Sequence, residues 1–172
     1  MSLLETYRAH VAERAALGIP PLPLSAKQTE GLIALLRQPP VGEEAFLVDL
    51  LTHRVPAGVD DAARIKAGFL DAVAKGAEKN ALVSRKLATE LLATMLGGFN
   101  IKPLIELLAD AEVGAVAAEG LKKTLLMFDY FHDVKELADK GVATAKGVMQ
   151  SWAEAEWFTS RPEVPQSMTL TV

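Results

Sequence analysis

The sequence VATAKGVMQSWAEAEWF occupies residues 142–158 and contains both tryptophans of the chain, Trp152 and Trp157. Apolar residues recur in it at helical spacing, so the sequence predicts one helix over the whole stretch. The residues that follow include Pro162 and Pro165, which a continuing helix does not tolerate. We therefore expect this stretch to close an array of helices, with Trp152 packed in its core.

The chain before it shows the same pattern, in which apolar stripes of helical spacing alternate with short segments rich in glycine and proline. Ser25 with Gln28 fits a capping box, and either Asp60 or Asp61, as well as Ser84 and Asn100, is suited to begin a helix as its N-cap. The pattern predicts about nine helices, over residues 3–17, 25–37, 43–54, 60–75, 84–96, from Asn100 onward, 112–128, 129–140 and 142–158.

The predicted helices indicate an all-α fold. Helix pairs open near Ser25, Asp60, Asn100 and Asp129, a spacing of roughly 30 to 40 residues that is close to that of HEAT-like repeats. A stacked array and a compact bundle both fit this spacing, and the absence of a heptad seam favours a HEAT-like α-solenoid of antiparallel helices.

We place the helical domain at residues 1–160. Residues 161–172 read as a linker and the start of a following domain, since their end alternates like a strand.

Composition limits the function. The 172 residues are 50% apolar but only 6% aromatic, the net charge is −4, and there is no cysteine. Disulfides, thiolate metal sites and cysteine-ligated iron–sulfur clusters are therefore excluded within these residues. The acidic balance gives no electrostatic reason to expect nucleic acid. Neither a signal peptide nor a membrane-spanning stretch is evident, which predicts a cytoplasmic protein without membrane contact.

No motif in the sequence predicts catalysis, cofactor binding or metal binding. Residues 114–124 resemble a phosphate-binding loop, but five residues separate the two glycines and no lysine follows the second directly. The three histidines are scattered, and the acidic pairs near residues 43 and 60 suit helix N-termini. Trp157 and Phe158 fall beside the apolar stripe of their helix. An exposed aromatic pair facing a neighbouring domain and a pair packed in the local core both fit this position.

Several stretches along the chain resemble the N-terminal helical domain of the bacterial aconitase B family, whose members are aconitate hydratases and 2-methylisocitrate dehydratases. The similarity is specific and covers nearly the whole chain in order. The matching stretches are YRAHVAERAA (7–16), FLVDLLTHRVPAGVD (46–60), KAGFL (66–70), GGFN (97–100) with Pro103-Leu104-Ile105, TLLMFDYFHDV (124–134), and VMQSWAEAEWF (148–158) with Arg161-Pro162.

The resemblance implies a HEAT-like domain that precedes catalytic domains on the same polypeptide. Those domains interconvert citrate and isocitrate through cis-aconitate in the tricarboxylic acid cycle, using a [4Fe-4S] cluster whose open iron acts as a Lewis acid. The cluster cysteines, the serine base and the substrate arginines belong to the later domains. By this resemblance the present chain holds no cofactor and is inactive by itself.

The resemblance also implies a role in protein association, which includes homodimer formation, contact with other enzymes of the tricarboxylic acid cycle, shaping of substrate access, and messenger RNA binding by the full-length protein. We expect contacts with the catalytic domains at the loop Gly97, Gly98, Phe99 and Asn100, at the turn 128–133 with His132, and at Trp157 with Phe158. The alternative is a free-standing helical interaction module or RNA-binding regulator. If the reading frame of the gene continues past Val172, a domain of the enzyme is favoured over the free-standing module.

Overall fold

The computed structural model describes residues 2–160, which form ten helices and, within that range, no strand. The helices are α1 (Leu3–Ala16), α2 (Ala26–Arg37), α3 (Glu44–His53), α4 (Asp61–Ala74), α5 (Arg85–Ala93), α6 (Ile101–Leu107), α7 (Gly114–Lys122), α8 (Met127–Asp139), α9 (Ala143–Ala153) and α10 (Glu156–Thr159). The all-α prediction is confirmed. The predicted strand and the linker at 161–172 lie outside the described residues.

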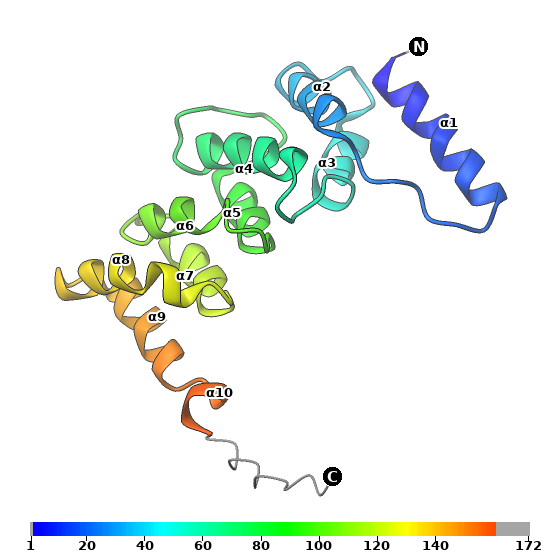
Figure 1. Ribbon diagram of the computed structural model, residues 1–172. Helices are drawn as coiled ribbons and strands as arrows, with labels where there is room; N and C mark the ends of the chain where they lie inside the picture. The colour runs from blue at the N-terminus through cyan, green and yellow to red at the C-terminus, as the bar shows by residue number, and fades with distance from the viewer. Residues whose placement is uncertain (1, 161–172) are drawn as a thin grey trace, which may run out of the picture.

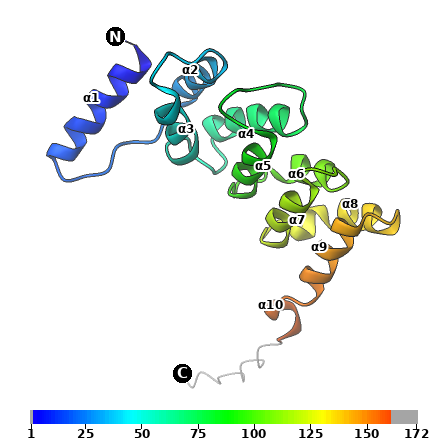
Figure 2. The same cartoon turned by 180° about the vertical axis from the view of Figure 1, so that it is seen from behind.

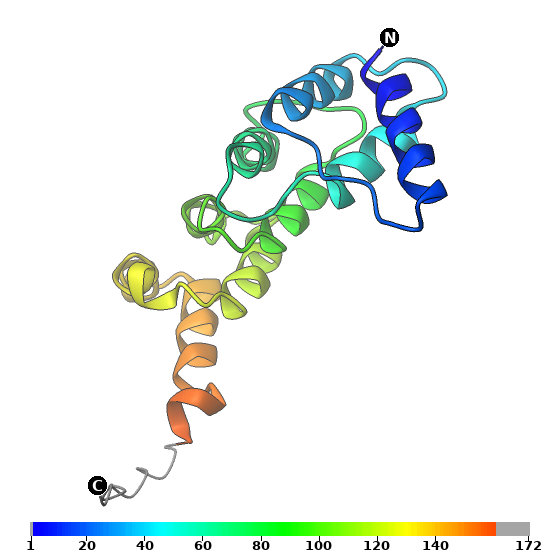
Figure 3. The same cartoon turned by 45° about the vertical axis from the view of Figure 1, so that its right-hand side comes forward.

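The helices form an elongated array that runs from α1 at one end to α10 at the other (Figures 1 and 2). After α1 they alternate between two rows. Figure 3 shows α4, α6 and α8 nearly end-on in one row, while α5, α7 and α9 are seen from the side in the other. Each helix packs on its nearest neighbours along the array: α4 lies against α2 and α5, and α7 lies against α5, α6 and α9. The core is the apolar layer enclosed between the rows.

Local capping determines where four of the helices begin. The side chains of Ser25, Asp60 and Ser84 each accept a hydrogen bond from the backbone amide three residues later, as predicted. The capping box of Ser25 and Gln28 is complete, and Ser2 forms a second box with Glu5 that the sequence analysis missed. Each cap satisfies an amide that would otherwise have no partner in the first helical turn.

The prediction that Asn100 caps its helix is wrong. Asn100 stands at the N-cap position of α6, but its side chain makes no capping hydrogen bond. The residue three positions later is Pro103, which has no amide hydrogen to donate. Asn100 instead turns its Nδ2 toward the end of α5, where it donates to the carbonyl oxygens of Leu92 at 2.8 Å and Met95 at 3.0 Å.

Two predicted helix ends are also wrong. The helix expected to reach Phe128 ends at Lys122, because the hydroxyl of Thr124 accepts the amide of Leu126 and forms a turn. Residues 128–133, expected as a turn, therefore lie inside α8. The single helix expected over 142–158 is divided at Ala155, whose backbone is extended, into α9 and the short α10.

Close packing joins the later helices. Gly120 of α7 faces α5 so closely that a Cβ atom would lie 2.6 Å from the Cβ of Ala93, so a residue without a side chain is needed for the two helices to approach this closely. Trp152 of α9 is buried, and its indole nitrogen donates to the carbonyl oxygen of Leu121 at 2.9 Å. The hydrogen bond satisfies the one polar atom of this large side chain, so Trp152 closes the core as expected.

Candidate protein-interaction surface

One long edge of the array is polar. It is formed by four connectors, which link α2 to α3, α4 to α5, α6 to α7 and α8 to α9, and we call it the polar edge: residues 38–43, 75–84, 108–113 and 140–142. Ion pairs bridge residues in or beside successive connectors. They are Arg8 with Glu43 (2.5 Å), Arg37 with Glu78 (2.8 Å), Lys75 with Glu106, and Arg85 with Asp110 (2.5 Å) and Glu112 (2.6 Å).

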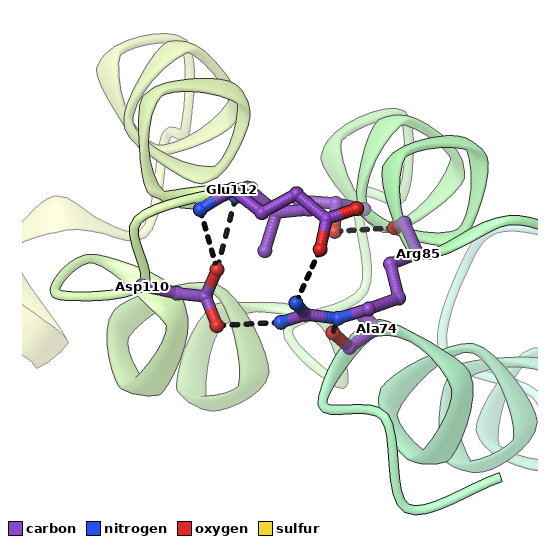
Figure 4. Close-up of polar contacts among 6 residues, drawn as sticks. Ala74, Arg85, Asp110 and Glu112 are labelled. Carbon is purple, nitrogen blue, oxygen red and sulfur yellow. Dashed lines mark hydrogen bonds and ion pairs between the residues drawn. The ribbon is translucent and has the colours of Figure 1, made fainter.

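Arg85 makes the most extensive of these contacts (Figure 4). Its Nε donates to the carbonyl oxygen of Ala74 at the end of α4, and its terminal nitrogens bind Asp110 and Glu112 in the connector before α7. The guanidinium, together with the amides of Val113 and Glu112, holds the pKa of the Asp110 carboxyl below its usual range. One side chain thus fixes the ends of three helices to one another.

We expect Arg85→Ala to lower the melting temperature by about 3 °C, because it removes contacts to both a helix end and a connector. Differential scanning calorimetry of the purified chain measures the change. Arg64→Ala is the matched control, since within residues 2–160 Arg64 pairs only with the exposed Asp61 on its own helix and such pairs contribute little. Equal shifts for the two variants would show that the Arg85 contacts add no specific stability.

Four further connectors, those that precede α2, α4, α6 and α8, form the opposite, apolar edge: residues 17–25, 54–60, 94–100 and 123–126. Backbone hydrogen bonds join the first three, from the Leu24 amide to the Arg54 carbonyl and from the Leu96 amide to the Ala57 carbonyl, each 2.8 Å long. Three side chains project from the last three connectors almost unburied: Val59 is 79% exposed, Leu96 81% and Leu125 90%. Leu17 and Leu22 add exposed apolar area in the first connector.

Charge is sparse along the apolar edge. Its only charged residues are Arg54, Asp60 and Lys123, and Asp60 is occupied in capping α4. Single exposed apolar side chains are common on protein surfaces, but apolar groups at successive positions along one edge are typical of a contact surface. The contrast with the ion pairs of the polar edge makes the apolar edge the candidate interaction surface.

Gly97 sets the spacing between two connectors of this edge. A Cβ atom on Gly97 would lie 1.9 Å from the carbonyl oxygen of Gly58 and 2.9 Å from the amide nitrogen of Val59. Only a residue without a side chain allows such an approach to backbone atoms. This contact holds Val59 beside Leu96, and the next residue, Gly98, brings the connector close to the side chain of Leu126.

A groove opens between the connectors 94–100 and 123–126. It encloses about 460 Å³, and its walls include Met95, Leu96, Leu125 and Leu126, with Lys123 also lining it. Asn100 lines it too and is only 2% exposed. The Nδ2 of Asn100 is used by the end of α5, while its Oδ1 is buried without a hydrogen-bond partner among the residues that the structure describes.

Comparison with known proteins places the chain in a family. The sequence profile described as the aconitate B N-terminal domain matches residues 6–158. The chain belongs to the aconitase B N-terminal domain family. It is 61% identical over 170 residues to the aconitate hydratase B of Pseudomonas aeruginosa, 58% identical over 170 residues to that of Escherichia coli, and 52% identical over 172 residues to that of a Synechocystis strain.

Each of these alignments covers 99% of this chain but 20% of the relative. The chain therefore spans about one fifth of the length of the aconitate hydratases B that it matches.

Within residues 2–160, no group of three or more histidine, aspartate or glutamate side chains is arranged to hold a metal ion. Every helix described is too short or too polar to span a bilayer.

The residues predicted as contacts of this aconitase B domain separate into two groups. Gly97, Gly98 and Asn100 lie on the apolar edge; Gly97 is partly buried against the backbone of Gly58, and Asn100 is buried. Phe99 packs partly against the core. His132 is exposed on α8 with its ring edge-on to Phe131, and it does not line the groove. Trp157 and Phe158 belong to α10, and their side chains lie outside what the structure describes.

The three most exposed large apolar side chains of the apolar edge, Val59, Leu96 and Leu125, were not predicted as contact residues. Leu96 is the last residue of the helix expected over 84–96, and Leu125 falls inside the helix expected over 112–128, which in fact stops at Lys122. The sequence did indicate an apolar surface here, since the connectors 17–25 and 94–100 contain no charged residue, which is unusual for loops in water.

Proposed function

We propose that this chain is the HEAT-like N-terminal domain of an aconitate hydratase B, and that it serves association with the remaining domains rather than catalysis. The full protein would interconvert citrate and isocitrate through cis-aconitate in the cytoplasm, with a [4Fe-4S] cluster held by later domains. The observation that carries the association role is the apolar edge. Val59, Leu96 and Leu125 stand on successive connectors and are the side chains that a docked domain would cover.

The two-row packing supports the HEAT-like assignment. Among residues 2–160 the main helix contacts join elements one or two places apart in the chain, such as α4 with α5 and α5 with α7. Arrays of this kind present long continuous surfaces and use them to bind other proteins or domains. The length of the relatives supports the association role, since four fifths of each lies outside the part that this chain matches and would be available for this domain to contact.

A binding experiment tests the association role. The chain is produced separately from the polypeptide that follows this region in the Pseudomonas aeruginosa relative, and binding between the two is measured by isothermal titration calorimetry. We expect a complex, and we expect Leu96→Asp combined with Leu125→Asp to weaken it at least about 100-fold, because two carboxylates would be desolvated in an apolar contact. The chain alone should not convert citrate to isocitrate, whereas the complex with a loaded cluster should.

Val41→Asp is the matched control. Val41 is 98% exposed, but it lies in the connector 38–43 on the polar edge. Its replacement should leave binding unchanged, and circular dichroism should show that all variants keep their helices. If the double variant binds as well as the original chain, the apolar edge is not the docking surface. Turnover of citrate by the chain alone would contradict a purely associative role.

A further inference from the structure

The groove between the connectors 94–100 and 123–126 has the properties of a specific binding site. We propose that it receives one apolar side chain carrying an N–H or O–H donor, such as an indole, presented by the polypeptide that follows this region in the relatives. The donor would bind Asn100 Oδ1 and the ring would pack between Leu96 and Leu125. This inference rests on the proposed function and adds the chemistry of the contact.

The walls of the groove select an apolar group. Met95, Leu96, Leu125 and Leu126 contribute methyl and methylene surface, and Gly120 lines the groove without a side chain of its own. A volume of about 460 Å³ lies within the range in which proteins bind compact organic groups. Because Leu96 and Leu125 are 81% and 90% exposed, most of their apolar surface remains in water until something enters.

The orientation of the Asn100 amide is determined by its neighbours. Two carbonyl oxygens, those of Leu92 and Met95, face its Nδ2, so the opposite orientation would place oxygen against oxygen. Oδ1 must therefore be the atom turned away from the end of α5. It is buried and has no partner within residues 2–160.

A buried acceptor without a hydrogen bond is uncommon and destabilising in proteins. Asn100 makes no capping hydrogen bond to α6, and one of the two usual donors to an N-cap acceptor is missing because Pro103 has no amide hydrogen. An entering donor would satisfy this oxygen in an environment that excludes water, where the hydrogen bond is strongest. Asn100 thus adds a requirement for a donor to a groove that otherwise selects only for apolar surface.

The length of the relatives indicates what the occupant is. Four fifths of each aconitate hydratase B lies outside the region matched by this chain, so in those proteins a large polypeptide is tethered to this domain and is present at high effective concentration. Lys123 lines the groove and is the one charged residue of its two connectors. An occupant with an acidic residue beside its ring would match this charge.

Indole and benzofuran are the probes for a test on the isolated chain. They have nearly the same shape, but benzofuran has an oxygen where indole has the N–H donor. Titration into the ¹⁵N-labelled chain, followed by NMR, should shift the amides of Leu96 and Leu125 and the side-chain amide of Asn100. We expect indole to bind about 5- to 10-fold more tightly than benzofuran, the effect of one hydrogen bond to an otherwise unsatisfied acceptor.

Two variants locate the binding. Leu125→Asp should abolish the shifts caused by indole, whereas Val41→Asp on the polar edge should preserve them. Equal affinity of indole and benzofuran would overturn the role of Asn100 Oδ1, and an absence of saturable shifts near the groove would overturn the site itself. Either result can occur while the separate domains still bind each other through the apolar edge, so failure here is distinguishable from failure of the proposed function.

Discussion

Replacing Gly97 by alanine is expected to lower the free energy of unfolding by about 3 kcal/mol, the upper part of the range for overpacking. The new methyl group would lie 1.9 Å from the Gly58 carbonyl oxygen and 2.3 Å from its carbonyl carbon. Both obstacles are backbone atoms, so no side chain can rotate to make room. The connectors 54–60 and 94–100 would have to separate, which would break the hydrogen bond from the Leu96 amide to the Ala57 carbonyl.

Urea unfolding followed by circular dichroism measures this loss. Gly68→Ala is the control, because Gly68 lies inside α4 with nothing within 4 Å of the added Cβ atom. Alanine is the better helix former, so this control should gain about 0.5–1 kcal/mol. An unchanged stability for Gly97→Ala would mean that the two connectors are not held together in solution. A destabilised variant should also lose affinity for the downstream domains, since Val59 and Leu96 would no longer share one surface.

Lys66→Met should stabilise the domain by about 2–3 kcal/mol at pH 7. The side chain of Lys66 is 1% exposed in α4, and it makes no hydrogen bond or ion pair with any residue that the structure describes. Burial lowers its pKa from 10.5 to about 8, because the charged form loses its hydration. Methionine has a similar length and volume and carries no charge that needs water.

The advantage of methionine should depend on pH. Between pH 8 and pH 10.5 the unfolded chain holds a proton on Lys66 that the folded chain has released, so the contribution of Lys66 to stability rises with pH in this window. Below pH 8 both states are protonated and the full cost of burying the charge remains. The difference between Lys66→Met and the original chain should therefore be largest at pH 7 and much smaller at pH 10.

Urea unfolding at the two pH values gives both differences, and comparison with the original chain at each pH cancels the titration of all other groups. Lys86→Met is the control, since Lys86 is exposed and pairs only with Glu90 on its own helix. It should change stability by less than about 0.5 kcal/mol at either pH. A loss of stability in Lys66→Met at pH 7 would show that the ammonium group has a favourable partner.

The helix boundaries show how far local sequence patterns extend. Ser25 and Ser84 were predicted as N-caps and are N-caps, and of the two candidates Asp60 and Asp61 it is Asp60 that caps α4; each of these bonds joins residues only three positions apart. The Asn100 prediction was wrong for an equally local reason, since Pro103 occupies the position whose amide should have been bound. The end of α7 was missed because apolar periodicity continues through Leu125, while Thr124 diverts the backbone into a turn.

The sequence by itself determined that the chain is helical, where most of the helices begin, and which family it belongs to, because these depend on contacts within one helical turn or on the order of residues. Only the tertiary structure decided which connectors are neighbours. Gly58 and Gly97 meet although they are far apart in the chain, and Leu96 and Leu125 share a groove for the same reason. The exposure of an apolar side chain depends on what distant segments cover, and periodicity within one helix carries no information about that.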